Sequence, residues 1–324
     1  MQKQLPIQKI TQMLIVLTAS ILLGLGGTLF AQTDELPWQL DAQLQPTADS
    51  KSFLWEVRSP TTHVYLLGSV HLANKTLYPL KPTIMQAYNS SETLVVEADT
   101  KSIDKSQVNK LTQKYGMYQK GTDLQKEIPK ELYQQLDAKL LKINMQAEYF
   151  KTMKPWLVGL TYTMLSFSLQ RLHDSERERF SQSYGIDEYF LRQARGKKPI
   201  EELESAEFQI KLLGSMPKNE QILFLEYSLD GKSQLDMTKL MTIWKEGDIP
   251  SLEKMLFRAL QANKKYEFIY EKLFWKRNRS MSEKIEGYLT GKKVYFIVVG
   301  AGHLVGKDSI IDILQKKKYK IKRL

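Results

Sequence analysis

The sequence contains no cysteine, which excludes several kinds of site at once. Without thiols the chain can form no iron–sulfur cluster and no cysteine-based zinc site, and it has no cysteine nucleophile. Histidine is also scarce, because only His63, His71, His173 and His303 are present. We therefore expect any metal site to use these few histidines together with carboxylates.

Long apolar runs are absent beyond the amino terminus, as are internal repeats and low-complexity tracts. The segment "KPWLVGLTYTMLSFSLQRL" (154–172) is uncharged for about 16 residues, which is short of the roughly 20 that a membrane-spanning helix needs. Thr161, Thr163 and Ser166 also interrupt it. This pattern predicts a buried helix, or a helix that lines a hydrophobic groove.

No recognisable nucleic-acid-binding motif accompanies the basic character of the chain. The formal net charge is +11, but the lysines and arginines are spread along the sequence and cluster only at Lys197-Lys198 and in the tail "QKKKYKIKRL". Such a balance favours a solvated basic surface near an anionic membrane over binding to nucleic acid. We predict no nucleic-acid partner.

Large apolar side chains are plentiful. The 324 residues are 42% hydrophobic and include 16 tyrosines, 12 phenylalanines and five tryptophans, enough for a sizeable core without disulfides or structural zinc. We expect residues 32–324 to form a single domain.

Residues 1–31 resemble a secretory signal peptide. Lys3 and Lys9 form a basic region, an uncharged run extends from Met13 to Ala31, and small residues lie near its end. An uncleaved signal anchor is the alternative, because a run of roughly 18 apolar residues is at the lower limit for spanning a bilayer. Both interpretations predict an exported protein, either periplasmic or extracellular, or anchored to the membrane through this segment.

The next part of the chain predicts a β-hairpin followed by a helix and a third strand. The runs "SFLWEVRSP" (52–60) and "THVYLLGS" (62–69) are the hairpin strands, and "SETLVVEAD" (91–99) is the third strand. A short helix over about 78–88 separates them, so we expect the third strand to lie parallel to the second.

Helical patterns dominate two long stretches, at about 101–180 and 206–289, which we interpret as helical insertions. Between them a helix begins near Asp187 and stops at Gly196, and a short strand follows at 198–204. The carboxyl-terminal "KKVYFIVVGAGHLVGKDSIIDILQKKKYKIKRL" predicts a βαβ unit. The expected fold class is therefore α/β with α+β elements, built on a mixed sheet.

Two apolar strands run into the same short pattern, Gly-x-x-His-Leu, in "VYLLGSVHL" and "VYFIVVGAGHL". Ligands of open α/β sheets bind beyond the carboxyl ends of the strands, and glycine allows the backbone to turn sharply there. One such motif is weak evidence, because a histidine in a turn often bonds only to backbone. Two motifs at strand ends predict that His71 and His303 lie at one rim of the sheet.

Glu97 ends the third apolar strand in "LVVEAD" and is expected at the same rim. Two histidines and one carboxylate can hold a divalent metal with open positions for water and substrate. His71, His303 and Glu97 are thus the candidate metal ligands, with manganese, cobalt or zinc as the metal. Glu97 could instead pair with Arg277, and both interpretations can hold together because neighbouring groups often orient a ligand.

Four more polar residues have candidate roles. Glu204 follows a strand and is a candidate general base, although it could be a surface acid paired with a lysine. Arg277 and Asn278 could stabilise an oxyanion, or belong to an exposed helix turn. Asp187 could cap a helix or belong to the site. Ser69 lacks the second glycine of a nucleophile elbow and is not predicted as a nucleophile.

The sequence resembles the TraB/GumN family, which includes the TIKI metalloproteases. The resemblance covers, with gaps, nearly all of the chain after about residue 50, and the paired Gly-x-x-His motifs with the glutamate between them are its most specific part. The matching segments are "VYLLGSVHLANKTLYPL", "LVVEAD", "MKPW", "GIDEYFLRQARGKKPIEELES", "RNRSMSEKI" and "VVGAGHLVGKDSIIDILQKKKYKI".

This resemblance implies a metal-dependent hydrolase, in particular a peptidase acting on a peptide or protein substrate, with a fold similar to the erythromycin esterase and ChaN-like group. His71 and His303 match the paired histidines and Glu97 the glutamate. Further polar positions of the family match Asp187, Glu204, Arg277 and Asn278. The alternative functions are a non-catalytic protein that sequesters a peptide, signal molecule or haem, and a membrane-tethered protein whose site is vestigial.

Overall fold

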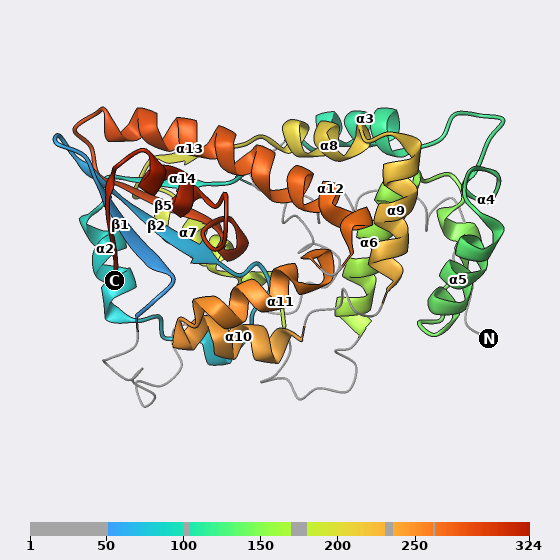
Figure 1. The fold of residues 1–324 in the computed structure, drawn as a ribbon, viewed down its shortest axis with the longest axis horizontal. Helices are drawn as coiled ribbons and strands as arrows, with labels where there is room; N and C mark the ends of the chain where they lie inside the picture. Colours follow the sequence, from blue (N-terminus) through green and yellow to red (C-terminus); the bar gives the residue numbers. More distant parts are fainter. Residues whose placement is uncertain (1–50, 100–103, 170–179, 231–235, 262) are drawn as a thin grey trace.

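The computed structural model describes residues 51–99, 104–169, 180–230, 236–261 and 263–324 (Figure 1). The predicted leader at 1–31 lies outside these ranges. The strands are β1 (Leu54–Arg58), β2 (His63–Ser69), β3 (Thr93–Val96), β4 (Ile200–Glu202), β5 (Tyr295–Gly300) and β6 (Lys320–Arg323). The α-helices before β5 and after it are α2 (Pro82–Ser90), α3 (Lys105–Gly116), α4 (Leu124–Glu127), α5 (Lys130–Leu141), α6 (Pro155–Leu169), α7 (Ile186–Ala194), α8 (Ala206–Gly214), α9 (Lys218–Leu229), α10 (Met237–Glu246), α11 (Ile249–Gln261), α12 (Glu267–Tyr270), α13 (Lys276–Leu289) and α14 (Ile310–Lys316).

The predicted hairpin is confirmed. Strands β1 and β2 pair antiparallel, with Leu54 opposite Leu67 and Arg58 opposite His63. The backbone N–H of Ser59 donates to the Thr62 carbonyl at 2.8 Å and closes the turn between them. Leu54, Trp55, Val57, Val64, Leu66 and Leu67 are all buried, so the two apolar runs of the sequence form a strand pair inside the core.

The mixed α/β fold class is also confirmed, with six strands in the order β4-β3-β5-β2-β1-β6. Strand β3 has the predicted direction relative to β2, but β5 lies between them and pairs parallel with both. Strand β6 pairs antiparallel with β1 at the other edge, so β1 is the only described strand that opposes the direction of the other five. Strand pairing thus brings the two Gly-x-x-His segments, distant in sequence, onto adjacent strands.

Aromatic packing holds α2 and α7 against the central strand β5. The ring of Phe190 on α7 lies 4.8 Å from that of Phe296 on β5, and Tyr88 on α2 lies 5.0 Å and 5.5 Å from the same two rings. Offset and edge-on aromatic contacts of this kind add about 0.5–1.5 kcal/mol each to the burial of apolar surface. Helix α7 is thereby held beside β5, in reach of the end of β2.

Most helices from the two predicted insertions gather away from the sheet (Figure 1). They bury a second apolar cluster, separate from the one around the sheet, that includes Leu136, Phe150, Leu213 and Leu225. Helix α6 belongs to this cluster, as the prediction of a buried helix requires, and Trp156 is fully buried. None of the helices in the described ranges has the length and apolar character needed to cross a membrane.

A long helical segment joins the two clusters (Figure 1). It consists of α12, one π-helical stretch at Glu271–Trp275 and α13. Ile269 on α12 packs in the second cluster, whereas Met281 and Ile285 on α13 pack against the sheet. π-Helical turns inside α-helices are frequent at functional sites, and this one ends directly before Lys276 and Arg277.

Candidate functional site

The two Gly-x-x-His motifs lie side by side at the carboxyl end of the sheet. Strands β2 and β5 are parallel neighbours, with Ser69 opposite Gly300, so His71 and His303 follow adjacent strand ends. A Cβ added at Gly68 would lie 3.0 Å from the Cα of Ala301, which explains the small residue at this position of the first motif. The prediction that both histidines lie at one rim is confirmed.

Glu97 follows β3, the other parallel neighbour of β5, and reaches the same rim. Its Oε1 accepts a hydrogen bond from the backbone N–H of Gly300 at 2.6 Å and lies 3.6 Å from Nε2 of His303. Burial raises the pKa of the Glu97 carboxyl, but the attraction of His303 and Arg277 and the Gly300 N–H outweigh burial and hold the pKa below its usual value. Glu97 is therefore ionised.

The three predicted ligands surround the backbone of Gly300. A Cβ added there would lie 3.3 Å from Oε1 of Glu97, 3.4 Å from Nε2 of His71 and 3.5 Å from Cδ2 of His303. Only a residue without a side chain leaves this space open. Within the described ranges, however, the structure contains no ready-formed group of three histidine or carboxylate side chains spaced to hold a metal ion.

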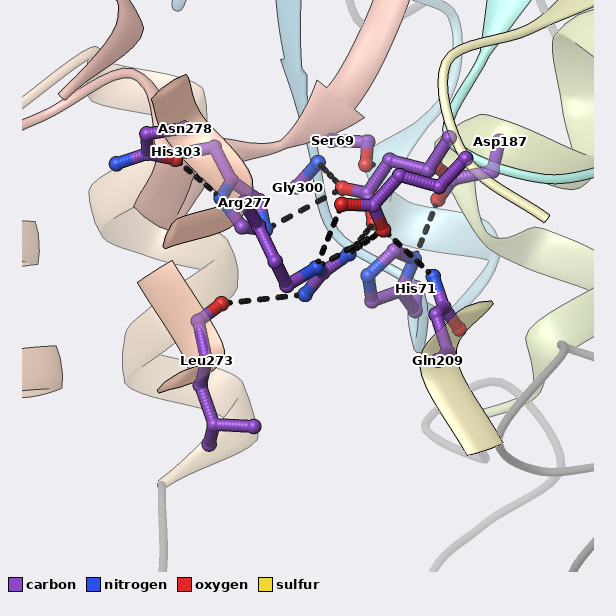
Figure 2. A network of polar contacts seen from close by, with 11 residues as sticks. Ser69, His71, Asp187, Gln209, Leu273, Arg277, Asn278, Gly300 and His303 are labelled. Atoms are coloured by element: carbon purple, nitrogen blue, oxygen red, sulfur yellow. Dashed lines mark hydrogen bonds and ion pairs between the residues drawn. The ribbon is translucent and has the colours of Figure 1, made fainter. Parts of the chain in front are cut away.

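His71 is held by a hydrogen-bonded pair of side chains (Figure 2). Its Nδ1 lies 2.8 Å from Oδ2 of Asp187, and the Ser69 hydroxyl donates to Oδ1 of the same carboxylate at 2.8 Å. The first turn of α7 brings Asp187 there, because the N–H of Ile186 donates to the Val70 carbonyl. Asp187 is not the N-cap residue, which is Gly185, but it does lie in the first helical turn, where an acidic side chain is favourable.

His303 is buried, with 5% of its side chain exposed against 62% for His71. Its Nδ1 lies 2.6 Å from Oδ1 of Asn278 on α13, and the ring of Phe274 lies 5.3 Å from its own. Burial lowers the pKa of His303 to about 3, whereas the Asp187 carboxylate raises the pKa of His71 to about 9. At neutral pH His303 is thus neutral and His71 is protonated.

Arg277 binds two carboxylates at once (Figure 2). Its Nη2 donates to Glu97 and to Glu204 at 2.7 Å each, and its Nε donates to the two oxygens of Glu204 at 3.0 and 2.9 Å. Nη1 donates to the Leu273 carbonyl in the π-helical stretch at 3.2 Å. Burial lowers the pKa of Arg277, but the two carboxylates raise it further than burial lowers it. The predicted pairing of Glu97 with Arg277 is present.

The sequence of the whole described sheet and its helices matches one family model. The model of the TraB/PrgY/gumN family covers residues 53–323. The chain belongs to the TraB/PrgY/gumN family. The match spans every strand and both Gly-x-x-His motifs.

Several members of the family are similar over most of the chain. The uncharacterized protein YbaP of Escherichia coli K12 is 24% identical over 78% of the chain and 88% of its own length. A metalloprotease TIKI homolog of Nematostella vectensis is 23% identical over 93% of the chain and 73% of its length. Metalloprotease TIKI1 of Danio rerio is 24% identical over 85% of the chain, but the match spans only 64% of that protein. No solved structure gives a significant match, so the predicted likeness to the erythromycin esterase and ChaN-like group stays a prediction.

Glu204, Arg277 and Asn278 of this TraB/PrgY/gumN protein are all gathered around the site, although their chemical roles stay predictions. Glu204 is buried against Arg277, so the alternative of a surface acid paired with a lysine is wrong. Arg277 and Asn278 do not lie on an exposed helix turn either, since Asn278 is 1% exposed and Arg277 has 13% of its side chain exposed.

Four participants in this family member's site were not assigned a role from the sequence. Ser69 orients Asp187, the Gln209 amide donates to Glu204 at 3.1 Å, the Gly300 N–H binds Glu97, and the Leu273 carbonyl binds Arg277. Gly300 could be found in the sequence, because it is the first glycine of the second Gly-x-x-His motif. Gln209 and Leu273 carry no local pattern that distinguishes them from other helical residues.

The side chains gathered at this rim are of the types that can bind a divalent cation. Nε2 of His303 lies 3.6 Å from Oε1 of Glu97, and Nε2 of His71 borders the same space at Gly300. Imidazole nitrogen and carboxylate oxygen are the ligands that zinc and related metals take in the absence of thiolates.

Proposed function

We propose that this protein is a metal-dependent hydrolase that cleaves peptide bonds, with His71, His303 and Glu97 as the residues that hold the metal. The observation that carries the proposal is that Nε2 of His303, Oε1 of Glu97 and Nε2 of His71 lie around one space beside Gly300. The metalloprotease names of its TIKI relatives support a peptide or protein substrate. A divalent ion such as manganese, cobalt or zinc would supply an activated water and polarise the scissile carbonyl.

The charged side chains around this position have complementary parts in the proposed reaction. Arg277 places a fixed positive charge beside Glu97, where it can stabilise negative charge that develops on the substrate. Asp187 holds Nδ1 of His71, which leaves Nε2 as the nitrogen that can bind the metal. Both oxygens of Glu204 are bonded to Arg277, which favours an orienting role for Glu204 over that of general base.

Metal titration tests the proposal directly. Isothermal titration of the purified protein with zinc, manganese or cobalt is expected to show stoichiometric binding. His71→Ala and His303→Ala should each weaken it by more than the 10- to 100-fold that loss of an outer hydrogen-bond partner costs. His63→Ala is the matched control, because His63 contacts Glu56 and Tyr65 and lies outside the site.

Two outcomes would contradict this function. Unchanged metal binding in the His71→Ala/His303→Ala double variant would remove the metal site. A visible absorption band on addition of haem that disappears in the same variant, without turnover of a peptide library, would identify a binding protein in place of a hydrolase.

We also propose that the protein acts outside the cytoplasm, on the pattern of residues 1–31. Fractionation of cells that express the full chain with a carboxyl-terminal tag is expected to recover it from the exported or membrane fraction. Recovery of the whole pool from the cytoplasm would contradict export.

A further inference from the structure

We propose that Asn278 is a positioning residue that keeps the hydrogen of His303 on Nδ1, so that the lone pair of Nε2 faces Glu97. The importance of this orientation for metal binding rests on the function proposed above. The orientation itself follows from hydrogen bonds within the chain. Asn278 would thus orient His303, whereas the sequence suggested that it stabilises an oxyanion.

The amide of Asn278 can adopt only one orientation in this structure. Its Nδ2 lies 2.9 Å from the backbone carbonyl of Asp308, and a carbonyl oxygen can only accept a hydrogen bond. The amide nitrogen must therefore face Asp308, and the amide oxygen must face His303. Since that oxygen also only accepts, Nδ1 of His303, 2.6 Å away, must carry the hydrogen.

The loop between β5 and α14 holds the Asp308 carbonyl in place. Asp308 has a left-handed backbone with φ of 56°, and Gly306 two residues earlier has φ of 82°. The N–H of Asp308 donates to Oδ2 of Asp312 at 2.7 Å, and the Ser309 side chain caps α14. A left-handed conformation is unfavourable for a non-glycine residue, so the surrounding contacts determine this carbonyl's direction.

The other neutral form of His303 would close the site. With the hydrogen on Nε2, the ring would point a donor at Oε1 of Glu97, 3.6 Å away, and a small shift would make a charge-assisted hydrogen bond. That bond would engage both Nε2 of His303 and Oε1 of Glu97, so neither atom would be free to bind a metal. Asn278 opposes this form because its buried oxygen would then lose its donor, which is unfavourable for a buried polar atom.

The first motif uses the same ring geometry with a different partner. Nδ1 of His71 faces Asp187 as Nδ1 of His303 faces Asn278, and Nε2 of His71 is also left toward Gly300. The partner of the exposed histidine is a carboxylate and that of the buried histidine a neutral amide. A neutral partner is suited to the buried ring, because a second buried carboxylate beside Glu97 would add uncompensated negative charge.

Nitrogen NMR of the metal-free full chain, labelled in its histidines, tests the inference. In the wild type Nε2 of His303 is expected to give the signal of an unprotonated ring nitrogen and Nδ1 that of a protonated one. Asn278→Leu, similar in volume but without an acceptor, should move the hydrogen to Nε2 and lower zinc affinity 10- to 100-fold. Asn278→Asp keeps an acceptor for Nδ1 and should keep the hydrogen on that nitrogen.

Ser282→Ala is the matched control. Ser282 lies one turn further along α13, is 1% exposed, and has a hydroxyl without a hydrogen-bond partner, so its loss should change neither the ring signals nor zinc affinity. Circular dichroism of each variant reports whether it is folded.

Each result bears on the inference separately from the proposed function. A wild-type His303 with its hydrogen on Nε2, or an Asn278→Leu variant with unchanged ring signals, overturns the positioning role. A wild type that binds no zinc overturns the proposed function, whereas the ring signals of the metal-free protein still decide the role of Asn278.

Discussion

Replacing Arg277 by methionine is expected to lower the free energy of unfolding by about 3–5 kcal/mol, because breaking a buried ion pair leaves uncompensated charge. Arg277 donates to both Glu97 and Glu204, whose side chains are 12% and 2% exposed. Methionine fills much of the volume but removes every one of these donors. Urea denaturation followed by circular dichroism measures the loss.

A neighbouring pair provides the control for this stability change. Lys276→Met removes the ion pair with Glu271, whose two side chains are 53% and 46% exposed, and exposed pairs contribute at most about 1 kcal/mol. Adding Glu204→Gln to Arg277→Met should recover part of the lost stability, since one of the stranded carboxylates is then neutral. A loss for Arg277→Met no larger than that for Lys276→Met would show that the network does not stabilise the fold.

Gly300→Ala is expected to abolish most metal binding and hydrolysis while leaving the protein folded. The added Cβ would lie 3.3 Å from Oε1 of Glu97, so this carboxylate must move by a few tenths of an ångström, and it would fill the space that His71 and His303 border at 3.4 and 3.5 Å. Displacements of about 1 Å in an active site can cost 100-fold in rate, and we expect a loss of about that size. The backbone of Gly300, with φ of −50° and ψ of 134°, is accessible to alanine.

The matched control for this variant is Gly287→Ala on α13. A Cβ there meets nothing within 4 Å, so alanine should stabilise the helix by about 0.5–1 kcal/mol without an effect on the site. Metal titration, peptide turnover and thermal unfolding of both variants separate the two effects. If Gly300→Ala retains wild-type metal affinity and turnover, the space beside Gly300 is not the metal position.

Much of the local structure could be predicted because it depends on neighbours in the sequence. The hairpin follows from two apolar runs separated by a short polar turn, and the ends of the apolar runs before His71 and Glu97 are visible as changes of composition. The pairing of the two Gly-x-x-His motifs at one rim also needed only the rule that parallel strands share their carboxyl ends.

The partners of these residues could not be predicted in the same way. Nothing near Asn278 in the sequence indicates that its amide binds His303, and Asp187 looked equally suited to capping α7. The contact of Arg277 with Glu204 joins the start of α13 to the end of β4. Each of these contacts depends on how the helices pack over the sheet. Sequences with the same local pattern but a different packing would place other side chains beside the histidines and Glu97.

The sequence by itself determined which residue types are available to the site: two motif histidines, two carboxylates that follow strands, and no thiol. It also determined the family, since the motifs and their order are properties of the chain. Only the tertiary structure decided the protonation of the two histidines, because pKa values depend on burial and on neighbouring charges. Asp187 holds the exposed His71 in its charged form, whereas burial beside Asn278 keeps His303 neutral, although both stand in the same short motif.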